Sequence, residues 1–389
     1  MSGYCLFLPE KRGIMKKVLV LLFIISCFSC GKKQLLPVLD IEELQNANCI
    51  VIDDSPGYQI QNYGAAFLDS TGGFQPKDIC KMTAMGESLY VLADGELRCY
   101  EFPSGKLRHR FLSSHCFSSF ALDTLTGTLY GLDGKRAELV SFLSDGRENG
   151  RMQLDRAYTY TNVDCTGGGQ LVLLTDEFPD PAVFKMKTFG GELIRLPVRG
   201  KGRKPMALPD SLACPLQVVG NGAEGKFYKY LLNDTLYLLK GDSCLPVFIC
   251  NMGKDGARFG SKTHALKNNR RLCITGLWET GDYWWIQYRS DYLVKEKLYR
   301  CTTMAILYKD LKIKDSGYEF FIQGKTIAMD TRFPVFLNEE GTCFLQIYDR
   351  ADHLKEEKKE LPYNLENAPD RDNLVLNYFY WKPIKNKKR

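Results

Sequence analysis

The sequence predicts an all-β protein, a six-bladed β-propeller of four-stranded antiparallel blades. Helical periodicity is nearly absent after residue 37, β-rich segments come in pairs joined by turn sequences, and the pairs recur at about 40 to 55 residues. Strands repeating at this spacing indicate propeller blades, because one four-stranded blade cannot bury both faces alone. The alternative, tandem β-sandwiches, would not require distant hairpins to resemble one another.

The repeated unit is a strand of the form polar-Leu-Tyr-apolar-Leu, followed by a turn and a second strand. An Asp-Gly pair between two such strands predicts a type I′ turn, in which both central residues have positive φ. The three clearest copies join 88–92 to 97–102 through Asp94-Gly95, 127–132 to 138–143 through Asp133-Gly134, and 235–239 to 245–250 through Gly241-Asp242. Two weaker copies join 283–288 to 297–309 and 334–337 to 343–348.

These hairpins divide the chain into one predicted propeller domain, residues 38–384, followed by a basic tail at 385–389. Residues 38–74 are expected to supply a strand that closes the last blade, because closure of the ring removes two open sheet edges. The predicted blades are 75–114, 115–156, 157–212, 213–260, 261–325 and 326–384.

The N-terminus has the features of a secretory signal peptide, predicted at residues 1–29. Lys16 and Lys17 precede an apolar run that is too short to span a membrane, and small residues follow it. Ser29-Cys30-Gly31 at the end of the run resembles the lipobox of bacterial lipoproteins, which implies that Cys30 is lipidated and that residues 30–37 form a tether. Met15 is a better start for this signal than Met1.

The net charge is too small to predict a nucleic-acid partner. The whole chain carries +6, and loss of the signal, with four basic residues and one acidic residue, leaves +3. The residues after Cys30 lack an acidic cluster resembling a surface-export signal of Bacteroidetes lipoproteins. The expected location is therefore the outer membrane of the cell envelope, with a lipid anchor that faces the periplasm rather than the cell surface.

Two segments carry a resemblance to a known family. Residues 88–111, SLYVLADGELRCYEFPSGKLRHRF, and residues 233–237 followed by GDSCLPVFICNMGK resemble the six-bladed β-propeller lipoproteins of Bacteroides and relatives. The resemblance covers most of the mature chain, and it implies the propeller fold. Its motifs belong to the blades and not to a catalytic centre, so it implies no activity.

Linear motifs for chemistry are weak, and we predict no cofactor and no metal site. Residues 220–225 match GxGxxG, but β-rich sequence follows where a dinucleotide site needs a helix. The four histidines, at 109, 115, 264 and 353, have no metal-ligand spacing. An enzyme would need acidic or histidine residues brought together by the fold, and the sequence leaves this possibility open.

Aromatic residues are the more suggestive candidates for ligand binding. Neighbours in a strand face opposite sides, so Trp284 and Trp285 are not expected in one core layer. Flat rings stack on apolar ligand faces, whereas the alternative role is packing between adjacent blades. The candidate ligand-binding residues are Trp278, Trp284, Trp285, Tyr288 and, in the basic segment 199–204, Arg203.

Together these features predict a lipid-anchored envelope propeller that acts as a binding or scaffolding module. Its ligand would be a glycan, a peptide or a protein partner held at one mouth of the ring. The alternative is a propeller enzyme, a polysaccharide lyase or glycoside hydrolase, with its site at the channel mouth.

Overall fold

Every regular element in the described part of the chain is a β-strand. The computed structural model describes residues 36–40, 50–51, 58–70, 74, 76, 79–111, 114–167, 169–175, 182–196, 217–222, 225–230, 235–251, 270–280, 283–294, 297–317, 319–322, 325–328, 333–338, 341–349 and 374–383. The signal segment 1–29, Cys30, Arg203 and the tail 385–389 lie outside these residues. Within them, the chain contains no helix long and apolar enough to cross a membrane.

Six antiparallel sheets form the blades, as the sequence predicts. Blade 1 contains β4 (Ile79–Met85), β5 (Ser88–Ala93), β6 (Glu96–Glu101) and β7 (Leu107–Phe111), and blade 2 contains β8 (Ser119–Asp123), β9 (Thr128–Asp133), β10 (Glu138–Phe142) and β11 (Glu148–Gln153). Blade 3 contains β12 (Tyr160–Gly167), β13 (Gln170–Thr175), β14 (Val183–Met186) and β15 (Leu193–Leu196). Blade 4 contains β16 (Gln217–Gly222), β17 (Gly225–Tyr230), β18 (Thr235–Lys240) and β19 (Ser243–Asn251).

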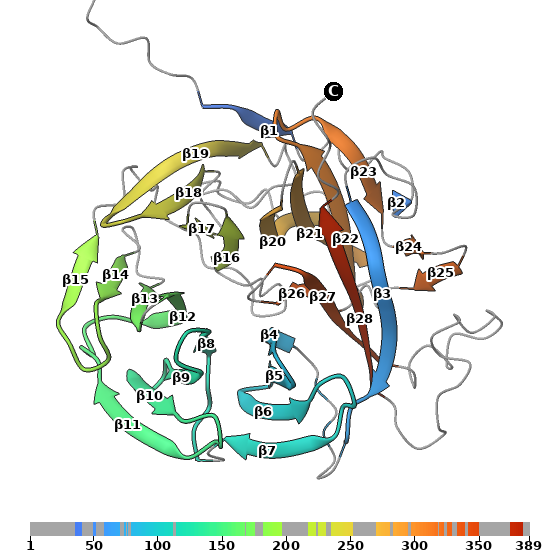
Figure 1. Cartoon of the computed structure of the whole chain (residues 1–389). Helices are drawn as coiled ribbons and strands as arrows, with labels where there is room; N and C mark the ends of the chain where they lie inside the picture. Colours follow the sequence, from blue (N-terminus) through green and yellow to red (C-terminus); the bar gives the residue numbers. More distant parts are fainter. Residues whose placement is uncertain are drawn as a thin grey trace, which may run out of the picture. The chain divides into compact units, whose positions relative to one another are not determined.

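Blades 5 and 6 complete the ring (Figure 1). Blade 5 contains β20 (Arg270–Thr280), β21 (Tyr283–Val294), β22 (Lys297–Tyr308) and β23 (Ile313–Gly317). Blade 6 contains β26 (Phe336–Leu337), β27 (Cys343–Asp349) and β28 (Leu374–Pro383), with β3 (Tyr58–Phe67) as its outermost strand. The N-terminal strand therefore closes the last blade, and the pairing runs from Tyr58 opposite Pro383 to Phe67 opposite Val375.

The N-terminal segment adds strands that the sequence pattern did not predict. Strand β1 (Val38–Asp40) pairs in parallel with β19, so blade 4 has five strands. Strand β2 (Ile50–Val51) pairs in parallel with β24 (Glu319–Ile322), which forms a hairpin with β25 (Lys325–Ala328). The first three strands thus pair in turn with blade 4, with a small three-stranded sheet and with blade 6.

The hydrophobic core consists of layers between neighbouring blades. Side chains alternate between the two faces of each strand, so every blade contributes apolar residues to two layers. Phe227 of blade 4 and Ile286 of blade 5 belong to one such layer, for example, and Ile79 of blade 1 and Leu345 of blade 6 belong to another. Cys99 and Cys343 are buried in these layers, as expected for cysteines that act as small apolar side chains.

The predicted type I′ turn forms at Asp94-Gly95 but not at Asp133-Gly134. Asp94 and Gly95 have φ values of 50° and 81°, and they join β5 to β6 as a two-residue turn of type I′ character. The type I′ prediction for Asp133-Gly134 is wrong. Four residues separate β9 from β10, and the positive φ falls on Ala137, at 52°.

The GxGxxG sequence forms part of a β-hairpin, as the sequence analysis expected. Strand β16 ends at Gly222 and pairs there with Gly225, the first residue of β17. A nucleotide-binding loop of this type must open a helix whose N-terminal amides bind the phosphates. The glycines therefore serve a hairpin, and Gly225, with φ at 155°, is closely packed against the carbonyl oxygen of Leu239.

Candidate functional site

A buried carboxylate joins three blades in the middle of the ring. Asp164 of β12 is flanked by two lysines, with its Oδ1 3.8 Å from Nζ of Lys81 on β4 and its Oδ2 3.3 Å from Nζ of Lys226 on β17. Lys81 also donates to the carbonyl oxygen of Val163 at 3.3 Å. We call Lys81, Asp164 and Lys226 the Asp164 cluster.

The Asp164 cluster sits where innermost strands meet. Strands β4, β8 and β12 are the innermost strands of blades 1, 2 and 3, and β8 contacts both of the others. Ser119, the first residue of β8, donates to Oδ1 of Asn162 and to the carbonyl oxygen of Val163 beside it. The cluster therefore connects blades 1 and 3 across blade 2, and its second lysine extends the connection to blade 4.

The chemistry of the Asp164 cluster is that of a permanent ion pair. Burial alone would raise the pKa of Asp164, but the charges of Lys226 and Lys81 and the backbone N–H of Cys165 hold it below its ordinary value. An aspartate held in its charged form accepts hydrogen bonds and cannot act as a general acid near neutral pH. Two ammonium groups against one carboxylate leave the cluster with a net charge of about +1.

Trp284 and Trp285 face opposite sides of blade 5, as strand alternation predicts. The ring of Trp284 contacts Phe227 and Phe248 of blade 4 at centroid distances of 5.1 and 5.5 Å. The ring of Trp285 contacts Phe344 of blade 6 at 4.6 Å. Both indoles are buried, with exposed fractions of 7% and 1%, so they fill the layers on the two sides of one blade.

The other candidate aromatic residues are also buried. Trp278 of β20 makes an edge contact with Phe344, and Tyr288 of β21 packs in the layer between blades 4 and 5. Nζ of Lys309 lies 4.9 Å from the centroid of the Trp284 ring, within range of a cation–π interaction. The same ammonium group forms an ion pair with Glu279. The structure therefore brings the four aromatic residues together in blade 5 as packing groups.

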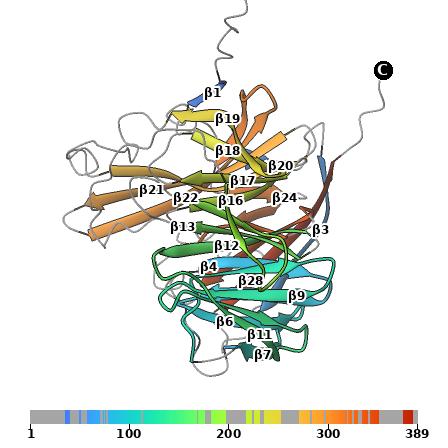
Figure 2. The same cartoon turned by 90° about the vertical axis from the view of Figure 1, so that its left-hand side faces the viewer.

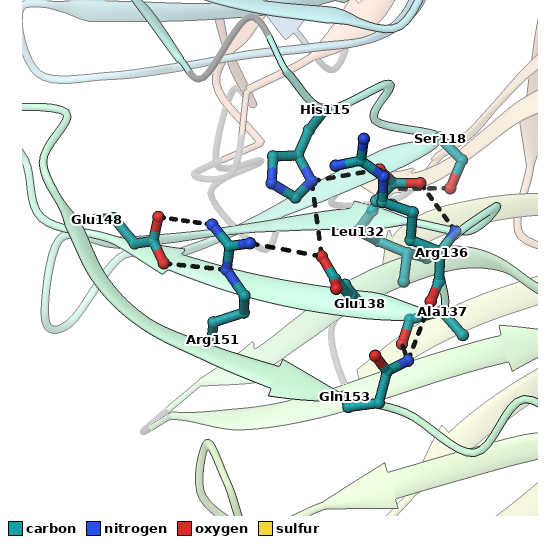
Figure 3. A network of polar contacts seen from close by, with 10 residues as sticks. His115, Ser118, Leu132, Arg136, Ala137, Glu138, Glu148, Arg151 and Gln153 are labelled. Carbon is teal, nitrogen blue, oxygen red and sulfur yellow. Dashed lines mark hydrogen bonds and ion pairs between the residues drawn. The ribbon is translucent and has the colours of Figure 1, made fainter.

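A second polar network joins the segment before β8 to strands β9, β10 and β11 of blade 2 (Figure 3). The buried His115 has its Nδ1 3.2 Å from Oδ2 of Asp133 and 3.9 Å from Oε2 of Glu138. Arg151 binds Glu148 at 3.0 Å and approaches Glu138 at 3.8 Å. The imidazole is stacked on Phe117 with an interplanar angle of 12°. With a side chain only 1% exposed, His115 orders the segment between β7 and β8 and is closed to a substrate.

Replacement of His115 by alanine is expected to lower the free energy of unfolding by about 1–3 kcal/mol, because Asp133 would lose a buried hydrogen-bond partner. Urea denaturation followed by circular dichroism measures the change. Arg147→Ala is the matched control, because its ion pair with Asp145 is exposed to solvent and should contribute little to stability. Equal effects of the two substitutions would contradict a structural role for the network.

Blade 5 is also distinguished by the length of its strands. Strands β20, β21 and β22 contain 11, 12 and 12 residues, whereas β4, β5 and β6 of blade 1 contain 7, 6 and 6. Pairing between β21 and β22 continues to Val294 opposite Lys297. The six additional residues of β21 correspond to about 20 Å. Figure 2 shows β21 and β22 extending past the other blades on one side of the ring.

Among the described residues, histidine, cysteine and acidic side chains form no group that could hold a metal ion. The members of the Asp164 cluster lie on three separate strands, so no linear motif in the sequence predicts the cluster. The available signal was a charged residue inside an otherwise apolar or small-residue strand, as at Lys81 in ICKMTAM. Asp164 stands among polar residues in YTNVDCTG, and Lys226 is one of two lysines in GKFYKY, so their strands carry no such signal.

The described strands define a six-bladed β-propeller whose last blade is closed by strand β3. No protein-family model matches the sequence, and no curated protein matches it. Similar solved structures include a protein of Bacteroides fragilis described as exported, with a TM-score of 0.58 and 11% identity over 90% of this chain and 99% of that one. At this identity the likeness establishes the fold and transfers no residue role.

Two further structures are less similar. A member of the DUF4221 family from Bacteroides vulgatus has a TM-score of 0.47 and 10% identity over 85% of this chain and all of that one, 100%. A virginiamycin B lyase from Staphylococcus aureus has a TM-score of 0.45 and 7% identity over 82% of this chain and 99% of that one. The likeness to the exported protein of Bacteroides fragilis supports the fold that the sequence resemblance implies.

Proposed function

We propose that this protein is a lipid-anchored cell-envelope β-propeller that acts as a binding or scaffolding module for a glycan, peptide or protein partner. The described fold is the propeller that such a module requires, and one structural relative is described as exported. The lipobox-like sequence ending at Cys30 supports attachment to the outer membrane, facing the periplasm. Cys30 is the residue that would carry the lipid.

The blade 5 hairpin is the observation that carries the binding proposal. Blades 1 and 2 fill their shared core layer with strands of five to seven residues, whereas β21 and β22 of blade 5 contain 12 residues each. The first eight residues of β21, Tyr283 to Ser290, are buried, and the pairing with β22 continues beyond them from Asp291 to Val294. A projecting hairpin that keeps its pairing to the tip offers a preformed surface to a partner.

The polar groups inside the ring support a scaffold. Asp164 is already neutralised by Lys81 and Lys226, so its charge stabilises contacts between blades. The buried Trp284 and Trp285 fix the base of the blade 5 hairpin between two neighbouring blades. In this proposal Trp278, Trp284, Trp285 and Tyr288 support the binding surface from beneath. Arg203 is proposed to contact the ligand directly.

Shortening the blade 5 hairpin is expected to weaken ligand binding at least tenfold without lowering the melting temperature. The variant replaces residues 291–300 by an Asn-Gly turn, so that Ser290 and Cys301, which are paired in the sheet, flank the new turn. The measurement is retention of the chain from Lys32 onward on glycan arrays and envelope fractions, with retained glycans assayed for cleavage.

Asp94→Asn is the matched control, because it places the same Asn-Gly turn in blade 1, where the hairpin does not project. It should bind as the parent chain does. Binding that survives in the shortened variant would contradict a ligand surface on the hairpin. Cleavage of a retained glycan would replace the binding module with an enzyme, the alternative that the sequence left open.

A further inference from the structure

Strand β1 is the described strand nearest in sequence to Cys30, the proposed site of lipidation. Strand β1 pairs with the outer strand of blade 4, with Val38 opposite Ile249 and Asp40 opposite Asn251. Eight peptide links separate Val38 from Cys30, and an extended chain of this length spans at most about 28 Å. Any lipid on Cys30 therefore holds the outer edge of blade 4 close to the membrane surface.

Exposed apolar side chains lie on the outer strands of blades 3 and 4. Val38 on β1 is 57% exposed, and Leu245 on β19 and Ile194 on β15 are each 41% exposed. They are three of the six exposed large apolar residues in the described part of the chain. Single exposed apolar residues are ordinary on a protein surface, but several on the outer strands of neighbouring blades indicate a contact surface.

Blades 3 and 4 adjoin at this edge. Lys185 of β14 binds Asp242, in the turn before β19, with 2.7 Å between Nζ and Oδ1. Ile194 is the register partner of Lys185 in the next strand. Figure 1 shows β15 and β19 following one another along the outside of the ring, with β1 beyond them. We call the strands β1, β15 and β19 the tethered rim.

We infer that the tethered rim lies against the lipid surface, an inference that rests on the lipid anchor of the proposed function. The partner is a lipid bilayer, because the short tether brings this rim to the surface and its exposed side chains are aliphatic. Lys32 and Lys33, beside the proposed anchor, add attraction to anionic lipid headgroups. With its rim on the membrane, the ring opens both mouths sideways, so neither mouth is covered by the bilayer.

Photo-crosslinking to lipid tests this orientation. The lipidated full chain is reconstituted in vesicles of phosphatidylethanolamine and phosphatidylglycerol, with p-benzoylphenylalanine placed at Leu245 or Ile194. The matched controls carry it at Leu125 or Leu143 of blade 2, which are 76% and 38% exposed. The tethered-rim positions should give at least fivefold more lipid adduct than the blade 2 positions.

Equal adducts at Leu125 and Leu245, or no adduct at the tethered rim while the protein sediments with the vesicles, would overturn the orientation and leave the anchor intact. A wild-type chain that does not sediment with vesicles, and that behaves as Cys30→Ala does, would overturn the anchor and with it this inference. Adducts confined to Leu245 and Ile194 that disappear in Cys30→Ala would establish both.

Discussion

Replacement of Asp164 by alanine is expected to lower the free energy of unfolding by about 3–5 kcal/mol, the cost of leaving buried charges without their counter-ion. Lys226 and Lys81 have side chains that are only 13% and 21% exposed, so water compensates little of the loss. The effect should appear as a lower urea midpoint with an unchanged m-value, because the substitution changes stability and not the surface exposed on unfolding.

A triple variant separates charge imbalance from the loss of packing. Replacing the whole cluster, with Lys81→Met, Asp164→Leu and Lys226→Met, removes all three charges and keeps similar volumes. Buried ionic groups exchanged for apolar groups in this way are often neutral or stabilising. The triple variant should therefore be more stable than Asp164→Ala, and equal destabilisation in both would contradict an electrostatic origin.

The contribution of Asp164 also depends on pH in a defined direction. Its pKa in the folded protein is lowered, so the carboxylate binds protons less readily when folded than when unfolded. Its stabilising contribution is complete above the unfolded pKa of about 3.9 and is lost as the pH falls through the lower folded value. The stability difference between the parent and Asp164→Asn, measured by urea denaturation, should shrink as the pH is lowered below about 4.

The blade pattern was predictable because it depends on short stretches of sequence. Alternation within β21 placed Trp284 and Trp285 on opposite faces, and the Asp94-Gly95 pair located the turn between β5 and β6. The Asp133-Gly134 turn was predicted wrongly, because contacts from outside the Asp-Gly pair determine its length. The carboxylate of Asp133 accepts the backbone N–H of Arg136, and its pairing with His115 holds it in a longer turn than the Asp-Gly pair suggested.

The Asp164 cluster and the tethered rim were not predictable in this way. Lys81, Asp164 and Lys226 meet only when blades from separate parts of the chain are curved into a ring. Strand β1 is three residues long, and its pairing is determined by the free edge of β19, not by its own sequence. Burial of the aromatic residues also depended on the neighbouring blades, because Phe248 and Phe344 supply the surfaces that cover Trp284 and Trp285.

Removal of β3 is expected to abolish the cooperative fold, the largest effect that the structure predicts. A chain that begins at Leu68 lacks the outermost strand of blade 6 and leaves β28 as an open ten-residue edge. Ala66, at the end of β3, also packs in the core layer shared by blades 1 and 6. The measurement is urea unfolding by far-UV circular dichroism, in which this chain should show a broad transition or none.

A chain that begins at Tyr58 is the matched control, because it loses β1 and β2 but keeps the closing strand. It should unfold cooperatively, with a stability close to that of the chain from Lys32, since β1 and β2 are short edge additions. If closure is the reason for the difference, a synthetic peptide of residues 58–67 added in trans should restore the transition of the chain from Leu68 by pairing with β28. A sharp transition in that chain without the peptide would mean that the ring is held by its core layers alone.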